Sequence, residues 1–275
     1  MAAARITALW IYPVKAGRGL ARAEAELGPL GLAFDRRWMV VRPDGRALTQ
    51  REEPRLAQLV PRLEPERLVL SLDGAELALP LDDSGEPLVA TVWGDRIEVV
   101  APDPAADRAL SDCLGRAVRI VRFPETTVRP CDPAFAPPGS RTAFSDGFPL
   151  LVTSLTSLAA LNAAIVSGGG TPVGMERFRP NLVLDGLPAW AEDRGGSLRL
   201  EEGALLRLVK PCARCIVTTT DQASGERLGP EPLRSLRALG RDLAGEGPCF
   251  GQNAVPLVPL GPVRLRLGQE VALAA

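Results

Sequence analysis

The chain has 275 residues, which is enough for one large domain or two medium ones with proper hydrophobic cores. Its 32 basic and 33 acidic residues leave a formal charge of −1, which argues against general nucleic-acid binding, since that requires a net basic face. Although 46% of the residues are apolar, no run approaches the roughly 20 apolar residues of a membrane-spanning helix.

Histidine and cysteine usage restricts the chemistry further. The chain contains no histidine, which excludes histidine-based catalytic triads and histidine metal sites. Its five cysteines are an odd number without framework spacing, and the N-terminus lacks the long apolar region of a secretion signal. We therefore expect a cytoplasmic protein with reduced thiols.

The first hundred residues predict a series of strands. Residues 6–15 form a strand stopped by Pro13, which cannot donate to a ladder, and Lys15 stands at its exit, either solvated or holding an anion. A buried strand at 38–41 has Arg36 and Arg37 at its entrance, which alternation sends to opposite faces. Short apolar segments then recur between turns, as in a β-barrel or β-sandwich. They are residues 56–60, 68–72, 75–79, 88–92 and 96–100.

The middle of the chain predicts two helices around an irregular segment. Residues 103–115 read as a helix with an aspartate cap, a proline at its first position and a terminating glycine. Strand 117–121 follows, and then residues 123–147 form a proline-rich stretch, a candidate domain boundary or lid. Strand 149–152 leads through Ser154 into a helix over 155–166. The start of that helix is an ordinary cap or a place to hold an anion.

The last hundred residues carry a pair of arginines and several further elements. Arg177 and Arg179 are two residues apart before Pro180, so an extended segment would put both on one side, where they could grip a phosphate. We expect a helix over 230–239 and a strand beginning near residue 250. Segments 263–267 and 271–273 read as a closing hairpin.

A Cys-x-x-Cys pair lies within residues 210–221. Cys212 and Cys215 are separated by Ala213 and Arg214, and β-favouring residues follow. We therefore expect Cys215 to open a strand and Cys212 to lie in the loop before it.

Four interpretations of this pair remain open from the segment alone. A thioredoxin-like redox pair would need its first cysteine at a helix N-terminus. A structural zinc site needs four ligands, whereas the other cysteines are scattered singly at 113, 131 and 249. A soft, redox-active metal could instead be bound by one thiolate. Finally, both cysteines could be small buried hydrophobes, which is the commonest case.

Five short motifs stand in the order and spacing of one protein family. They are Tyr-Pro-Val-Lys at 12–15, Asp-Arg-Arg-Trp at 35–38, Phe-Arg-Pro-Asn at 178–181, Cys-Ala-Arg-Cys at 212–215 and Phe-Gly-Gln at 250–252. Each motif is weak alone, but five in order are hard to obtain by chance, and they extend over nearly the whole chain. The chain resembles MOSC-domain proteins with an N-terminal MOSC β-barrel domain, the group of the mitochondrial amidoxime-reducing component and its bacterial relatives.

This resemblance implies a fold and a cofactor. The expected fold is mostly β with a few helices (α+β), with a β-rich N-terminal domain over residues 1–122 and a β-barrel MOSC domain over 123–275. The implied cofactor is the molybdenum cofactor, Mo-molybdopterin, a pyranopterin whose dithiolene holds the metal and which carries a terminal phosphate. Pyridoxal phosphate is not expected.

The resemblance also assigns roles to residues. Cys215 matches the family position that ligates molybdenum, and is therefore expected to be the metal ligand and the catalytic residue. Lys15, Arg36 and Arg179 match positions that bind the anionic parts of the cofactor. Three further matches complete the expected binding set, with Cys212 beside the metal ligand. They are Asn181, Ser154 and Thr218.

The implied chemistry is reduction of N-hydroxylated compounds such as amidoximes, hydroxylamines or N-hydroxylated bases. Electrons would come from a separate protein, a ferredoxin, a flavin reductase or a cytochrome b5-like donor, and neither nucleic acid nor membrane is an expected partner. One alternative is a non-catalytic carrier of the cofactor or a sulfur-transfer module. Another is a structural protein in which zinc clips the Cys-x-x-Cys loop.

Overall fold

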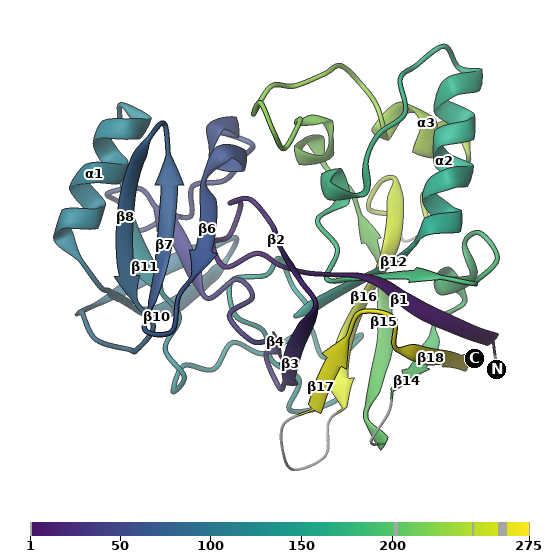
Figure 1. Ribbon diagram of the computed structural model, residues 1–275, viewed down its shortest axis with the longest axis horizontal. Coiled ribbons are helices and arrows are strands. Elements are labelled where there is room, and N and C mark those ends of the chain that lie inside the picture. Colours follow the sequence, from purple (N-terminus) through teal and green to yellow (C-terminus); the bar gives the residue numbers. More distant parts are fainter. Residues whose placement is uncertain (1, 201–202, 244, 258–262, 275) are drawn as a thin grey trace.

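A closed barrel forms the C-terminal part of the protein (Figure 1). In the computed structural model, which describes residues 2–200, 203–243, 245–257 and 263–274, eight strands are ordered β13-β12-β16-β15-β14-β18-β1-β2. A further pairing of β1 with β13 closes seven of them into the barrel. Their bounds are β1 (Ala2–Ile11), β2 (Leu20–Arg22), β12 (Leu150–Ser154), β13 (Leu182–Asp185), β14 (Gly196–Arg199), β15 (Leu205–Ala213), β16 (Cys249–Leu257) and β18 (Glu270–Ala274).

The N-terminal part packs two smaller antiparallel sheets around its own cores (Figure 1). One sheet contains β5 (Trp38–Val41), β11 (Arg119–Arg122), β10 (Asp95–Ala101) and β9 (Glu86–Val92). The other contains β6 (Val60–Leu63), β7 (Arg67–Leu72) and β8 (Ala75–Pro80). A third small sheet, of β17 (Val263–Arg266), β3 (Glu24–Gly28) and β4 (Gly31–Leu32), joins the two ends of the chain. The mostly β fold with a few helices is confirmed.

The first strand belongs to the C-terminal barrel, although the expected domain boundary lies between residues 122 and 123. β1 pairs with β13 and β18 of the barrel, although it comes from the N-terminal end of the sequence. The core of the barrel accordingly combines apolar side chains of β1, such as Ile6, with Leu182 of β13 and Leu206 of β15. After Lys15 the chain first pairs with β1 as β2, then adds β3 and β4 to the third small sheet, and enters the N-terminal sheets only at β5.

Local sequence signals explain where helices α1 and α2 begin. Helix α1 (Pro104–Leu114) begins where the Asp103 carboxylate accepts from the Ala105 N–H, and ends at Gly115 with a φ of 66°. Helix α2 (Leu155–Ser167) begins where the Ser154 hydroxyl accepts from the Ser157 N–H, and it covers the parallel crossover from β12 to β13. Helix α3 (Leu233–Ala238) is shorter than the predicted 230–239. None of the helices in the described part of the chain has the length and apolarity that a membrane crossing requires.

One predicted strand and one predicted strand pairing are wrong. Residues 54–58 form a 3-10 helix, η1 (Pro54–Gln58), with proline in its first turn, and the strand β6 begins only at Val60. The predicted closing hairpin does not form, because β17 pairs with β3 whereas β18 pairs with β1 and β14. Two strands separated by a tight glycine turn can thus belong to different sheets when each pairs with a strand from another part of the chain.

Candidate functional site

A solvent-connected cavity lies where the barrel meets the N-terminal sheets. Its volume is about 150 Å³, well above the ~10–15 Å³ that a single water needs. Seven of the eight predicted site residues line it. They are Lys15, Arg36, Arg179, Asn181, Cys212, Cys215 and Thr218.

The wall of the cavity is strongly cationic. Five of its side chains are lysine or arginine, and the only carboxylate among its lining residues is that of Asp146. Arg51 and Arg214 belong to this set, although neither was among the predicted site residues. A low-dielectric hollow with this charge balance favours an anionic ligand.

Lys15 is buried at one side of the cavity. Its backbone N–H donates to the Trp38 carbonyl at 2.7 Å, which ties the end of the first strand to β5. Its Nζ donates to the Phe144 carbonyl at 2.8 Å and to Asp146 Oδ1 at 2.6 Å. Burial lowers the pKa of the Lys15 ammonium, and the Asp146 carboxylate opposes that shift.

Arg36 is held by a fixed set of acceptors from the preceding residue and from the segment before β13. Its Nη1 donates to Asp35 Oδ2 at 2.6 Å and to Asn181 Oδ1 at 3.0 Å, and its Nη2 donates to the Arg179 carbonyl at 3.1 Å. Arg37 points elsewhere and donates to the Phe123 carbonyl at 3.1 Å, so the two arginines do take opposite faces. Burial raises the pKa of Asp35, and its contact with Arg36 opposes the rise.

Arg177 and Arg179 do not share an extended segment as predicted. Residues 175–178 form the 3-10 helix η2 (Met175–Phe178), and Arg179 closes it in the left-handed region with a φ of 55°. Arg177 is thereby turned away from the cavity and donates to the Thr219 carbonyl at 3.1 Å. Arg179 enters the cavity, where burial lowers its pKa to about 10. Pro180 disfavours helical geometry for Arg179, but the outcome is a left-handed residue instead of a strand.

The Cys-x-x-Cys segment also differs from the prediction. Cys212 lies in the last part of β15, and Cys215 precedes a 3-10 helix, η5 (Ile216–Thr219), so no strand opens at Cys215. The hydroxyls of Thr218 and Thr219 donate to the carbonyls three residues earlier, which stabilises the turn. Both cysteines are partly exposed free thiols on the cavity wall.

Arg214 lies between the two cysteines in the sequence and donates to two different groups. Its Nη1 donates to Cys212 Sγ at 2.9 Å and its Nη2 to the Phe178 carbonyl at 2.6 Å. Its Nε is buried with no hydrogen-bond partner among the described residues. An anionic ligand in the cavity would supply the acceptor that this buried N–H lacks.

Ser154 is the one predicted site residue that lies outside the cavity. Its hydroxyl contacts Ser157 Oγ at 2.7 Å and donates to Glu192 Oε2 at 3.2 Å, and the residue is fully buried. The start of α2 is therefore occupied by the protein's own carboxylate. The prediction of an anion site there is wrong, because a tertiary contact fills the position.

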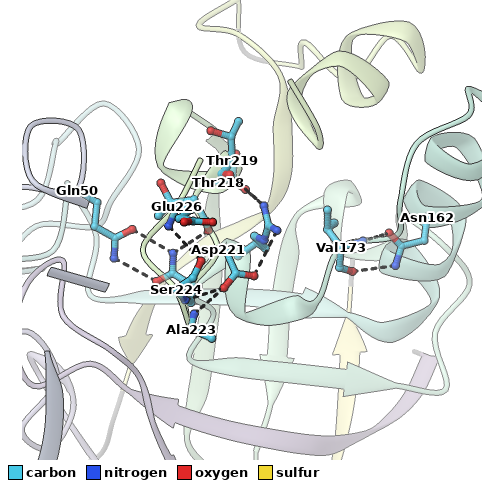
Figure 2. Close-up of polar contacts among 12 residues, drawn as sticks. Gln50, Asn162, Val173, Thr218, Thr219, Asp221, Ala223, Ser224 and Glu226 are labelled. Carbon is cyan, nitrogen blue, oxygen red and sulfur yellow. Dashed lines mark hydrogen bonds and ion pairs between the residues drawn. The ribbon is translucent and has the colours of Figure 1, made fainter. Parts of the chain in front are cut away.

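A loop after η5 fastens the cavity floor to the N-terminal part. The side-chain amides of Gln50 and Gln222 exchange hydrogen bonds at 3.1 and 3.0 Å, and Figure 2 shows Gln50 facing this loop. Asp221 accepts from the Ala223 and Ser224 backbone N–H groups, which fixes the turn (Figure 2). Gln222 Oε1 also accepts from Arg179. The loop thus links the segment of Cys215 to one of the cavity arginines.

The donor set suits a molybdenum pterin better than zinc. In the described ranges, no group of three or more histidine, cysteine, aspartate or glutamate side chains could hold a metal ion, so a zinc clip finds no ligand set there. One thiolate with metal–sulfur bonds from a ligand's own dithiolene needs no such group, and the surrounding cations match a phosphate. The residues present therefore fit the cofactor implied by the motifs.

Comparisons with known proteins agree with this geometry. The family model of the MOSC N-terminal beta barrel domain matches residues 3–117, and that of the MOSC domain matches residues 139–272. The chain is 32% identical over 286 residues to mitochondrial amidoxime-reducing component 1 of Homo sapiens, covering 98% of this chain and 82% of that protein. Mitochondrial amidoxime reducing component 2 of Homo sapiens is 32% identical over 267 residues, covering 90% and 77%.

A further relative is named for a different activity. Molybdenum cofactor sulfurase of Oryza sativa subsp. japonica is 31% identical over 249 residues, which cover 84% of this chain and 30% of that protein. Both kinds of relative match most of this chain. Their match over most of this sequence, together with the two domain models, shows that the chain belongs to the MOSC family, with an N-terminal MOSC β-barrel domain followed by a MOSC domain.

Proposed function

We propose that the protein is a molybdenum-cofactor-dependent reductase of N-hydroxylated compounds, with the Cys215 thiolate as the protein's metal ligand. The observation that carries the proposal is the placement of the Cys215 thiol and five cationic side chains on the wall of one cavity. Similarity to the amidoxime-reducing components supports the reaction class. When bound, the cofactor would supply a redox-active metal that exchanges electron pairs and takes up oxygen.

The chain's own residues would hold and orient that group. Arg36 and Arg179 would bind its phosphate, because both line the cavity and Arg36 is held by Asn181 and by the Arg179 carbonyl. Lys15, which also lines the cavity, would bind a second anionic part of the cofactor. Cys212, held by Arg214, would lie beside the metal ligand, and the Thr218 hydroxyl would keep the Cys215 carbonyl in place.

The overall reaction needs two electrons and two protons. An N-hydroxylated substrate loses its N–O bond, the nitrogen gains one proton, and the oxygen leaves as water after taking the other. The electrons would come from a separate donor protein, of the ferredoxin, flavin reductase or cytochrome b5-like kind. Asp146, exposed at the cavity and bonded to buried Lys15, offers a route for protons from solvent.

The proposal is tested with the full chain purified from cells grown with molybdate. The protein should turn over benzamidoxime with a chemically reduced dye, and Cys215→Ala should abolish turnover. Cys113→Ala is the matched control, because Cys113 is also partly exposed but lies on α1 outside the cavity lining. Full turnover by the Cys215→Ala protein would contradict the assigned role.

A carrier or sulfur-transfer module is the second candidate. The observation in its favour is the similarity to molybdenum cofactor sulfurase over most of this chain. This candidate predicts that the purified protein contains cofactor, shows no turnover of N-hydroxylated compounds, and passes the cofactor to an acceptor apoenzyme. The benzamidoxime assay therefore separates the two functions.

A further inference from the structure

Tyr12 lies directly behind the two arginines of the cavity. It is the single tyrosine of the chain, and only 2% of it is exposed. The guanidinium carbons of Arg36 and Arg179 are each 4.3 Å from the centroid of its ring. Both arginines line the cavity, whereas Tyr12 itself is absent from the lining residues.

The two positively charged guanidinium groups of Arg36 and Arg179 thus lie against one buried ring, where water solvates them poorly. Arg36 has a carboxylate partner in Asp35, whereas the Arg179 guanidinium donates to two neutral groups, the Gly17 carbonyl at 2.5 Å and Gln222 Oε1 at 3.4 Å. Two guanidinium groups at such a site repel each other. The negative face of an aromatic ring attracts both, and this attraction strengthens as water is excluded.

The ring, more than the hydroxyl, carries this interaction. The Tyr12 hydroxyl is buried and has no hydrogen-bond partner among the described residues. The backbone of Tyr12 is fixed independently, because its N–H donates to Asp35 Oδ1 at 2.7 Å. The same carboxylate accepts from Arg36 through Oδ2, so the ring and one of the two arginines share an anchor.

We propose that Tyr12 is a positioning residue, whose ring holds Arg36 and Arg179 together so that both face one anionic group in the cavity. The inference rests on the proposed function only in that the cavity binds an anion. It does not depend on reductase activity. It assigns the tyrosine of the Tyr-Pro-Val-Lys motif a task separate from that of Lys15.

The test uses the full-length chain from a host that makes no pterin cofactor, with inorganic phosphate as the probe in titration calorimetry. Phenylalanine and its mono-, di- and trifluorinated analogues are placed at position 12, since fluorine weakens the ring quadrupole with little change in size. The same analogues at Phe123, whose ring lies 5.7 Å from the Arg37 guanidinium carbon away from the cavity, are the matched control.

The expected result is a graded loss of phosphate affinity along the series at position 12. Tyr12→Phe should bind phosphate within about twofold of wild type, and the trifluorinated ring should bind roughly tenfold more weakly. The series at position 123 should stay flat. Equal affinity across the series at position 12, or a large loss in Tyr12→Phe alone, would overturn the role of the ring. Failure of the wild-type protein to bind phosphate would overturn both this inference and the anionic ligand proposed for the cavity.

Discussion

The Asn181 side chain makes three hydrogen bonds in the cavity wall. Replacing it should lower both the affinity for an anion and the stability of the fold, and a control variant separates the two effects. Asn181 is 1% exposed. Its Oδ1 accepts from Arg36 Nη1 at 3.0 Å and from the Leu151 N–H at 3.1 Å, and its Nδ2 donates to the Trp10 carbonyl at 3.1 Å. Asn181→Leu removes all three bonds while nearly preserving volume.

The expected cost follows from the partners that stay buried. The Leu151 N–H loses one acceptor, the Trp10 carbonyl loses one donor, and Arg36 loses one of its anchors. At about 1 kcal/mol for each neutral bond and somewhat more for the charged one, the free energy of unfolding should fall by about 3–4 kcal/mol. Because Arg36 becomes free to turn, phosphate affinity should fall as well, by about tenfold.

Asn162 provides the matched control. It makes two hydrogen bonds to the Val173 backbone, both at 2.9 Å, and Figure 2 shows this pair apart from the Asp221 loop. Asn162→Leu should lower stability by about 2 kcal/mol and leave phosphate affinity unchanged. Urea unfolding and calorimetry with phosphate measure the two quantities. Equal phosphate affinity in Asn181→Leu and wild type would refute the reasoning.

Three further predictions address the surroundings of the cavity. Arg129 is buried and donates to the Ala143 and Ser145 carbonyls, so Arg129→Ala should lower the free energy of urea unfolding by about 3 kcal/mol, and an unchanged midpoint would contradict its role. A Cβ at Gly19 would lie 2.6 Å from Tyr12 Cε1, so Gly19→Ala should displace the ring and weaken phosphate binding. In the control Gly28→Ala the added Cβ meets nothing within 4 Å, and equal phosphate affinities of the two variants in calorimetry would be evidence against the ring's role. Burial raises the pKa of Glu192, so folding favours the protonated carboxyl and wild-type stability falls as the pH rises above the ordinary glutamate pKa of about 4. The stability gained by Glu192→Gln in urea unfolding should therefore grow as the pH rises from about 4, and a constant difference would exclude this titration.

Elements with their own start and stop signals were predictable from the sequence. Helix α1 follows from Asp103, a proline in its first turn and Gly115, all of which act within the helix itself. The segment after Cys215 was mistaken for a strand because β-branched residues favour strands in general. Here the threonine hydroxyls donate to nearby carbonyls and stabilise a 3-10 turn, a local competition that propensity alone cannot resolve.

The candidate site was predictable as a set of motifs but not as a geometry. Lys15, Arg36 and Cys215 were identified through the resemblance, and the structure brings them to one cavity. Ser154 was predicted to bind the cofactor but lies outside the cavity, because Glu192, nearly forty residues later, covers the start of its helix. Arg51 was missed because only the tertiary fold carries its loop to the cavity.

The claim that the Cys215 sulfur binds molybdenum is tested most directly by X-ray absorption at the molybdenum edge of the purified full-length protein. The account predicts a sulfur neighbour of the metal that is lost in Cys215→Ser and kept in Cys212→Ser. The same molybdenum–sulfur shell in wild type and Cys215→Ser would contradict it.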